Sequence, residues 1–160
     1  LKVHPQVGGL ASEELDEFTP AQENGKYLVL FDPLDGSSNI DINMCVGTIF
    51  SILPAKNAVT QAEDFMQAGN QQVAAGYVLY GPSTMLALTV GAGTVFFTFD
   101  PETQQFLLTS ENIQVAVDTK EYAINSSNQR HWENPVKRYI EELLAGKTGP
   151  REKDLSLIHI

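Results

Sequence analysis

The sequence predicts an α/β fold, a layered sandwich in which helices flank a mostly antiparallel or mixed sheet. Two observations favour it. Short apolar stretches follow one another with only turn residues between them, and one strongly amphipathic stretch comes late in the chain. Strands joined by short turns pair antiparallel, whereas repeated βαβ units would need a helix in each connection. A chain of 160 residues, 42% of them hydrophobic, is long enough to bury the core of such a sandwich.

The first strand is expected at residues 26–31, after the turn signal Asn24-Gly25. Pro33 and Gly36 are expected to break this strand into a loop, because proline lacks an N–H and glycine favours turns. Further strands are expected at residues 45–53, 73–80, 84–90, 94–100, 106–109 and 122–124. The stretches 84–90 and 94–100 flank Gly91-Ala92-Gly93, which predicts a hairpin.

The clearest helix is expected at residues 135–145. Its apolar side chains recur at helical spacing and fall on one face: Val136, Tyr139, Ile140, Leu143 and Leu144. Asn134 is expected to cap the helix, Pro135 suits its first turn, and Gly146 suits its end.

Composition excludes several function classes. The formal net charge of -10 argues against general nucleic-acid binding and against docking on an anionic membrane. No apolar run approaches the roughly 20 residues needed to span a bilayer. Cys45 is the only cysteine, so the chain has no internal disulfide, which is typical of a reducing compartment and suggests a cytoplasmic protein.

The loop after the first expected strand carries the chemistry. Asp32 and Asp35 are three residues apart, and Pro33 stiffens the turn between them so that the Leu34 carbonyl can point the same way. Oxygen ligands of this kind suit Mg²⁺ or Mn²⁺. Gly36 lets the backbone approach a ligand closely, and Ser37-Ser38 supply hydroxyls and N–H groups that can hold a phosphate. The string therefore predicts a joint metal and phosphate site.

A second acidic feature, Ser12-Glu13-Glu14, allows two interpretations. One is a helix N-terminus with Ser12 as its cap and the acids in the first turn. The other is a functional pair, in which one acid binds a metal and the other activates water. Residue patterns alone favour the helix.

Longer strings resemble the class I fructose-1,6-bisphosphatases. The resemblance is centred on residues 32–41 (DPLDGSSNID) and continues at 46–52 (VGTIFSI), 72–81 (QVAAGYVLYG) and 83–86. Residues 11–14 and 123–125 are also similar to family segments. The similarity extends to about Asp154, whereas residues 155–160 do not resemble the family and are interpreted as a tail.

This resemblance implies Mg²⁺-dependent hydrolysis of the 1-phosphate of fructose 1,6-bisphosphate, giving fructose 6-phosphate and phosphate, a step of gluconeogenesis and the Calvin cycle. Residues matching the family's motifs would have these roles: Glu13, Asp32, the Leu34 carbonyl and Asp35 as metal ligands, Glu14 in activating water, Asp35, Gly36, Ser37 and Ser38 at the phosphate, and Asn125 at the substrate. Two or more Mg²⁺ ions per site are implied, with Mn²⁺ as the alternative, and so is a homo-oligomer, namely a tetramer.

The resemblance also implies that residues 1–154 are part of a larger domain, its N-terminal metal-binding half, truncated at both ends. Such a piece is expected to be inactive alone. Three alternatives stay open: a sedoheptulose-1,7-bisphosphatase, an inositol-phosphatase-like enzyme, and a truncated metal-binding protein without catalysis.

Overall fold

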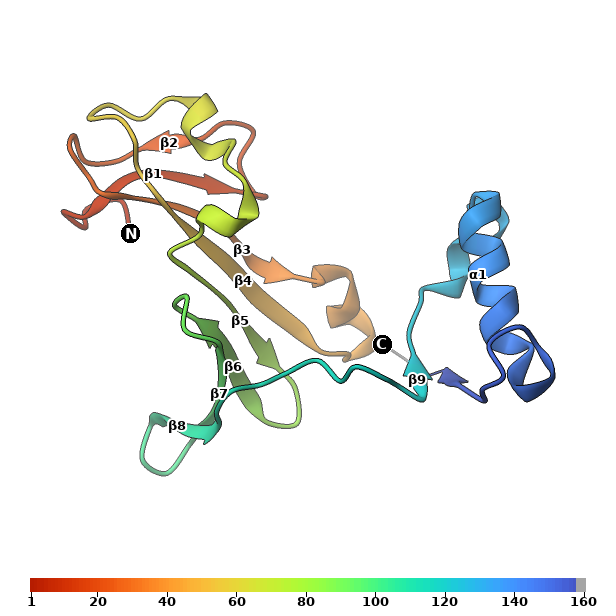
Figure 1. Cartoon of the computed structure of the whole chain (residues 1–160). Helices are drawn as coiled ribbons and strands as arrows, with labels where there is room; N and C mark the ends of the chain where they lie inside the picture. Colours follow the sequence, from red (N-terminus) through yellow and green to blue (C-terminus); the bar gives the residue numbers. More distant parts are fainter. Residues whose placement is uncertain (158–160) are drawn as a thin grey trace. The chain divides into compact units, whose positions relative to one another are not determined.

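The computed structural model describes residues 1–157, which form two compact units (Figure 1). The first unit is Leu1–Gln114 and the second begins at Val115. Residues 158–160, half of the expected tail, lie outside the described residues.

An eight-stranded sheet makes up the first unit, in the order β2-β1-β3-β4-β5-β6-β7-β8. Their bounds are β1 Val7–Ser12, β2 Thr19–Pro20, β3 Tyr27–Asp35, β4 Val46–Pro54, β5 Ala74–Tyr80, β6 Thr84–Thr89, β7 Thr94–Asp100 and β8 Gln105–Ser110. Neighbouring strands are antiparallel except β1 and β3, which run parallel. The predicted α/β class with a mostly antiparallel, mixed sheet is confirmed.

The strands differ from the prediction at the start of the chain. β1 and β2 were not expected, because Gly8-Gly9 interrupts any apolar alternation in β1 and β2 has only two residues. Pro33 was predicted to end the strand expected at residues 26–31. This prediction was wrong, since β3 continues through Pro33 to Asp35. Gly36 does end the strand, with a positive φ of 78° that glycine tolerates easily.

The helical segments of the first unit are short 3-10 helices, η1 Ser37–Ile42, η2 Ala62–Phe65 and η3 Gly69–Gln71. η2 carries a capping box. Asp64, which is 8% exposed, accepts hydrogen bonds from the Gln61 backbone N–H at 2.8 Å and from Asn57 Nδ2 at 2.6 Å. These bonds hold the loop between β4 and β5 over one end of the sheet.

The second unit contains the α-helix of the described chain, α1 Asn134–Leu144, with η4 Ser126–His131 and η5 Gly146–Thr148. A two-stranded parallel sheet joins β9 Glu121–Tyr122 to β10 Ser156–Leu157. Two ion pairs join residues in the segments that flank α1 in the sequence: hydrogen bonds from Lys153 and Lys147 lower the pKa of Asp118 and of Asp154 respectively.

The predicted cap of α1 was one residue too late. Asn134 is the first helical residue, and Glu133 precedes the helix without a side-chain cap bond. Pro135 does lie in the first turn, where its missing N–H costs nothing. Gly146 follows the helix with φ 63°, as expected for a glycine at a helix end.

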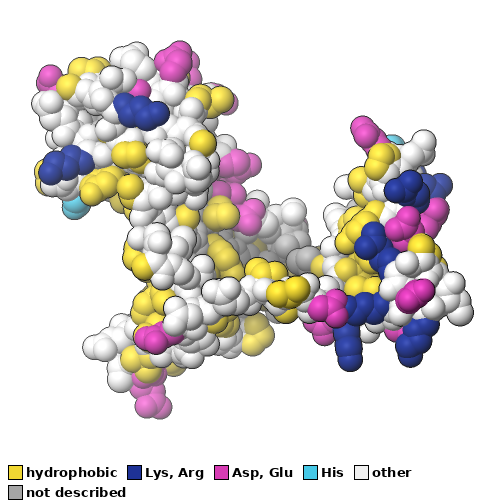
Figure 2. Space-filling model, viewed as in Figure 1, with side chains coloured by type: hydrophobic (Ala, Val, Ile, Leu, Met, Phe, Trp, Pro, Cys, Tyr) yellow, Lys and Arg dark blue, Asp and Glu magenta, His cyan; other side chains and the backbone are white. Residues whose placement is uncertain are grey.

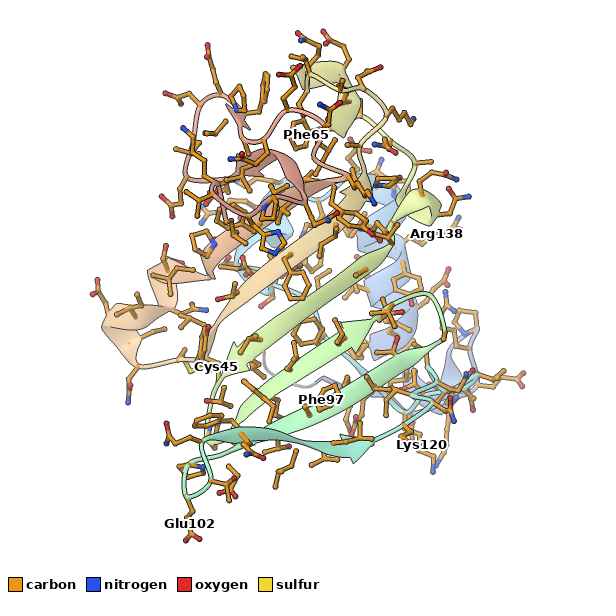
Figure 3. All side chains as sticks on the ribbon, turned by 90° about the vertical axis from the view of Figure 1, so that its left-hand side faces the viewer. Cys45, Phe65, Phe97, Glu102, Lys120 and Arg138 are labelled. Carbon is orange, nitrogen blue, oxygen red and sulfur yellow. The ribbon has the colours of Figure 1, made fainter. Side chains whose placement is uncertain are left out.

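The core of the first unit lies under β1 and β3. Leu28 is fully buried, and Val7, Leu10 and Val29 form a buried cluster against which Ala21 and Phe31 pack. The rings of Phe18 and Phe65 lie 5.7 Å apart and extend this packing to η2. Figure 3 shows Phe65 at the end of the sheet opposite Cys45, which lies exposed next to β4.

Both faces of the remaining sheet carry exposed apolar side chains. The register places Ile49 and Tyr77 side by side on one face, where they are 48% and 47% exposed. Phe106 and Leu108, 41% and 48% exposed, lie on the other face with Phe97 and Phe99. Apolar side chains are visible at the surface along this sheet (Figure 2). Phe97 is half-buried.

Candidate metal centre

Two strands bring the acidic residues together. β1 and β3 run parallel, with Ser12 opposite Phe31. The next residue on each strand, Glu13 and Asp32, therefore lies at the same level along the two strands. Carboxylate oxygens of Glu13, Glu14 and Asp32 lie within 4.8 Å of one another. The helix expected at Ser12 is absent: Ser12 ends β1 and a turn follows, in which the Glu14 N–H faces Ser12 Oγ at 3.4 Å.

An irregularity in β3 sets the direction of the second aspartate. Asp32 lies opposite Ile49 and Asp35 opposite Gly47, so three steps on β3 match two steps on β4. Residues three apart on a regular strand point to opposite faces, whereas the extra residue of a bulge restores the same face. Asp35 thus shares the face of Asp32, although it lies outside the group of three carboxylates.

Among the described residues, no basic side chain forms an ion pair with this group. In the part of the chain that the structure describes, the four ion pairs join residues between Asp118 and Asp154, all in the second unit. Three carboxylates this close repel one another unless a cation or protons intervene. An all-oxygen donor set that makes no ion pair within the described residues fits a hard divalent cation such as Mg²⁺.

The segment expected to hold phosphate follows directly. Gly36 turns the chain into η1, and the Asn39 N–H donates to the Gly36 carbonyl at 2.8 Å to close that turn. Ser37 and Ser38 are exposed, so their hydroxyls are accessible to a ligand. The predicted phosphate contact of these residues stays a prediction.

A shallow cavity of about 440 Å³ lies beside the acidic group. Glu13 and Asp32 contribute to its wall, together with apolar residues of β3 and β4 such as Phe31 and Ile49. Ser51 and Gln72 line it too, joined by a 2.7 Å hydrogen bond from Gln72 Nε2 to Ser51 Oγ. Sequence reasoning did not single out this pair, because one polar residue on a strand and one in a loop form no recognisable pattern.

Asn125, the residue expected at the substrate, belongs to the second unit. Its side-chain oxygen accepts hydrogen bonds from the Ser127 N–H at 3.0 Å and from the Ser127 hydroxyl at 2.6 Å, and so caps η4. Its predicted substrate contact stays a prediction.

A family model described as "Fructose-1-6-bisphosphatase, N-terminal domain" matches residues 1–111, nearly the whole first unit and all of its acidic residues. The chain belongs to the fructose-1,6-bisphosphatase family. This conclusion confirms the resemblance inferred from the DPLDGSSNID string.

Relatives within the fructose-1,6-bisphosphatase family extend the similarity to nearly the whole chain. "Fructose-1,6-bisphosphatase class 1" of Acinetobacter baumannii is 84% identical over 98% of the chain and 49% of its own length. The protein of the same name from Shewanella halifaxensis is 60% identical over 98% of the chain and 48% of its own length. The chain therefore spans about half the length of the curated relatives it matches.

Solved structures agree with the sequence relatives. The crystal structure of Leishmania major fructose-1,6-bisphosphatase in holo form is 36% identical and superposes with a TM-score of 0.86. It covers 97% of this chain, which corresponds to 49% of the Leishmania chain. No helix in the described residues combines the length and apolar character that crossing a membrane requires.

Proposed function

We propose that this chain is the metal-binding part of an enzyme that hydrolyses the 1-phosphate of fructose 1,6-bisphosphate, giving fructose 6-phosphate and phosphate. The observation that carries the proposal is the convergence of Glu13, Glu14 and Asp32, which form no ion pair with a basic side chain in the part of the chain that the structure describes. The names of the relatives support fructose 1,6-bisphosphate over the sedoheptulose and inositol phosphates.

The residues of the chain would divide the work as follows. Glu13, Asp32, Asp35 and the Leu34 carbonyl would hold Mg²⁺, two or more ions per site, with Mn²⁺ as a substitute. Such ions neutralise phosphoryl oxygens and lower the pKa of bound water, which is how metals accelerate phosphate-ester hydrolysis. Glu14 would orient the attacking water and take up its proton. Asp35, Gly36, Ser37 and Ser38 would position the phosphate, and Asn125 would contact the sugar.

The architecture of the longer protein is also a proposal. Residues 1–154 would form part of one bisphosphatase domain, and residues 155–160 a tail outside it. The enzyme would be a cytoplasmic homotetramer acting in carbohydrate metabolism. The chain covers about half of each relative, which supports a partial domain. We expect the chain alone to have little or no activity, because other substrate-binding elements would lie in the remaining half.

A two-part activity assay tests the proposal. The chain is extended with the residues that the Acinetobacter baumannii relative carries beyond the matched region, and phosphate release is measured with and without Mg²⁺. We expect Mg²⁺-dependent turnover of fructose 1,6-bisphosphate by the extended protein and almost none by the chain alone. Faster turnover of sedoheptulose 1,7-bisphosphate or inositol 1-phosphate would overturn the proposed substrate.

Asp35→Asn in the extended protein tests the proposed metal ligands. The substitution removes a charge and almost no volume, so we expect a loss of turnover of about 100-fold or more with an unchanged thermal midpoint. Asp41→Asn, an exposed aspartate in η1, is the matched control and should retain activity. Near-normal turnover of Asp35→Asn would show that Asp35 does not bind the metal.

A further inference from the structure

A side-chain bridge crosses three strands beside the irregularity in β3, on the face of the sheet opposite the Asp32 side chain. Thr48 on β4 lies opposite Val78 on β5, and Tyr80 is two residues further along β5, so Thr48 and Tyr80 share a face. Thr48 Oγ1 donates a hydrogen bond to the Pro33 carbonyl on β3 at 2.9 Å. The same oxygen lies 2.9 Å from the hydroxyl oxygen of Tyr80. Neither side chain has a role in the proposed chemistry.

Counting donors and acceptors shows which group donates in each hydrogen bond of this bridge. The Pro33 carbonyl can only accept, and a threonine hydroxyl has a single proton, so that proton goes to Pro33. The Tyr80 hydroxyl must therefore be the donor to Thr48 Oγ1. Tyr80 on β5 thus donates to Thr48 on β4, and Thr48 donates to Pro33 on β3. Hydrogen bonds aligned in this way polarise and strengthen one another.

The bridge ends on a peptide unit that also contacts Asp32. The Pro33 carbonyl and the Leu34 N–H belong to one planar group. The Leu34 N–H donates to Asp32 Oδ1 at 2.9 Å. This peptide unit lies where β3 leaves regular pairing with β4, between Asp32 and Asp35. Side chains hold it at both ends, Thr48 at the oxygen and Asp32 at the nitrogen.

We propose that Thr48, oriented by Tyr80, is a positioning residue that fixes the Pro33–Leu34 peptide plane and thereby the Asp32 carboxylate for metal binding. With Oδ1 held by the Leu34 N–H, the direction of the other carboxylate oxygen, Oδ2, is set as well, because the carboxylate is planar. Groups that orient a metal ligand commonly contribute 10- to 100-fold to metal affinity. The inference rests on the proposed metal site but not on the identity of the sugar.

Mn²⁺ affinity of the full 160-residue chain, measured by electron paramagnetic resonance of the free ion, tests the inference. Thr48→Val keeps the shape of the side chain and removes both hydrogen bonds, and we expect it to weaken Mn²⁺ binding about 10-fold. Thr48→Ser keeps the hydroxyl and should restore most of the affinity. Tyr80→Phe removes only the outer bond and should have a smaller effect than Thr48→Val.

The matched control is Thr98→Val. Thr98 lies on β7, and its hydroxyl also bonds a neighbouring strand's hydroxyl, Thr109 Oγ1 at 3.2 Å. A general effect of losing a threonine hydroxyl from the sheet would change both variants equally. We expect Mn²⁺ affinity to fall in Thr48→Val only, with similar thermal midpoints of the metal-free proteins.

A second measurement on the metal-free chain follows the peptide plane directly. Amide hydrogen exchange of Leu34, read by NMR, should be several-fold faster in Thr48→Val than in the unchanged chain or in Thr48→Ser. Equal Mn²⁺ affinity of the unchanged chain and Thr48→Val would overturn the positioning role and leave the metal site intact. No Mn²⁺ binding by the unchanged chain would overturn both the metal site and the positioning role toward it. Equal rates of Leu34 amide exchange in Thr48→Val and in the unchanged chain would show that Thr48 does not fix the peptide plane.

Discussion

Asp32 takes part in two local arrangements at once. Its side chain satisfies the Leu34 N–H, which β3 leaves without regular pairing, and also belongs to the group with Glu13 and Glu14. Leu34 is exposed, so this bond gives the N–H a protein partner in place of water and fixes the Asp32 carboxylate against the irregular strand end. The irregularity and the acidic group are therefore linked through one carboxylate.

Gly76 on β5 gives a prediction at the same scale. A Cβ at this position would lie 2.5 Å from the Ala87 carbonyl oxygen and 2.8 Å from Phe50 Cζ. Neither the strand backbone nor the ring can yield without disturbing the sheet, so we expect Gly76→Ala to lower the free energy of unfolding by about 1–3 kcal/mol. The shift of the urea midpoint measures this effect.

Gly69→Ala is the control for that experiment. No atom lies within 4 Å of a Cβ placed on Gly69, and its φ is not positive. This variant should keep the urea midpoint of the unchanged chain. Equal midpoints for Gly76→Ala and Gly69→Ala would mean that β5 and β6 do not pack as closely as described.

The strands in the middle of the chain can be predicted from the local sequence pattern. β4 to β8 carry β-branched and aromatic residues between clear turn signals, and each was predicted within one or two residues. β1 could not be predicted, because Gly8 and Gly9 have no apolar pattern and owe their extended conformation to neighbours. A side chain on Gly9 would lie 2.7 Å from Thr60 Cγ2, so the glycine permits close packing of β1 against the segment before η2.

The η2 segment allows a test at the element scale. Asp64→Ala leaves the Asn57 amide and the Gln61 N–H without their partner in a mostly buried place. We expect the free energy of unfolding to fall by about 1–3 kcal/mol. Glu63→Ala, an exposed neighbour in the same short helix, should be nearly neutral in the same urea titration, and equal losses for both variants would contradict the role of the capping box.

The first unit as a whole exposes large apolar side chains on both faces of its sheet. Ile49, Tyr77, Phe106 and Leu108 are each more than two-fifths exposed, on opposite faces of one sheet. Exposed patches of this kind favour association with other apolar surfaces.

We expect the chain alone to self-associate with rising concentration and to bind a dye that reports apolar surface. Light scattering coupled to size-exclusion chromatography would measure the first effect and dye fluorescence the second. The extended protein should bind less dye per chain. A monomeric chain without dye binding would show that these faces are covered within the chain itself.

Local pattern was sufficient for the central strands, the amphipathic helix and the acidic string at residues 32–38, because each is encoded by neighbouring residues. Tertiary pairing settled the rest. β1 is extended because β3 lies beside it, and that parallel pairing carries Glu13 and Glu14 to Asp32 from about twenty positions away in the chain. The relation of Thr48 and Tyr80 to Pro33 likewise depends on strand register, which no property of the separate segments specifies.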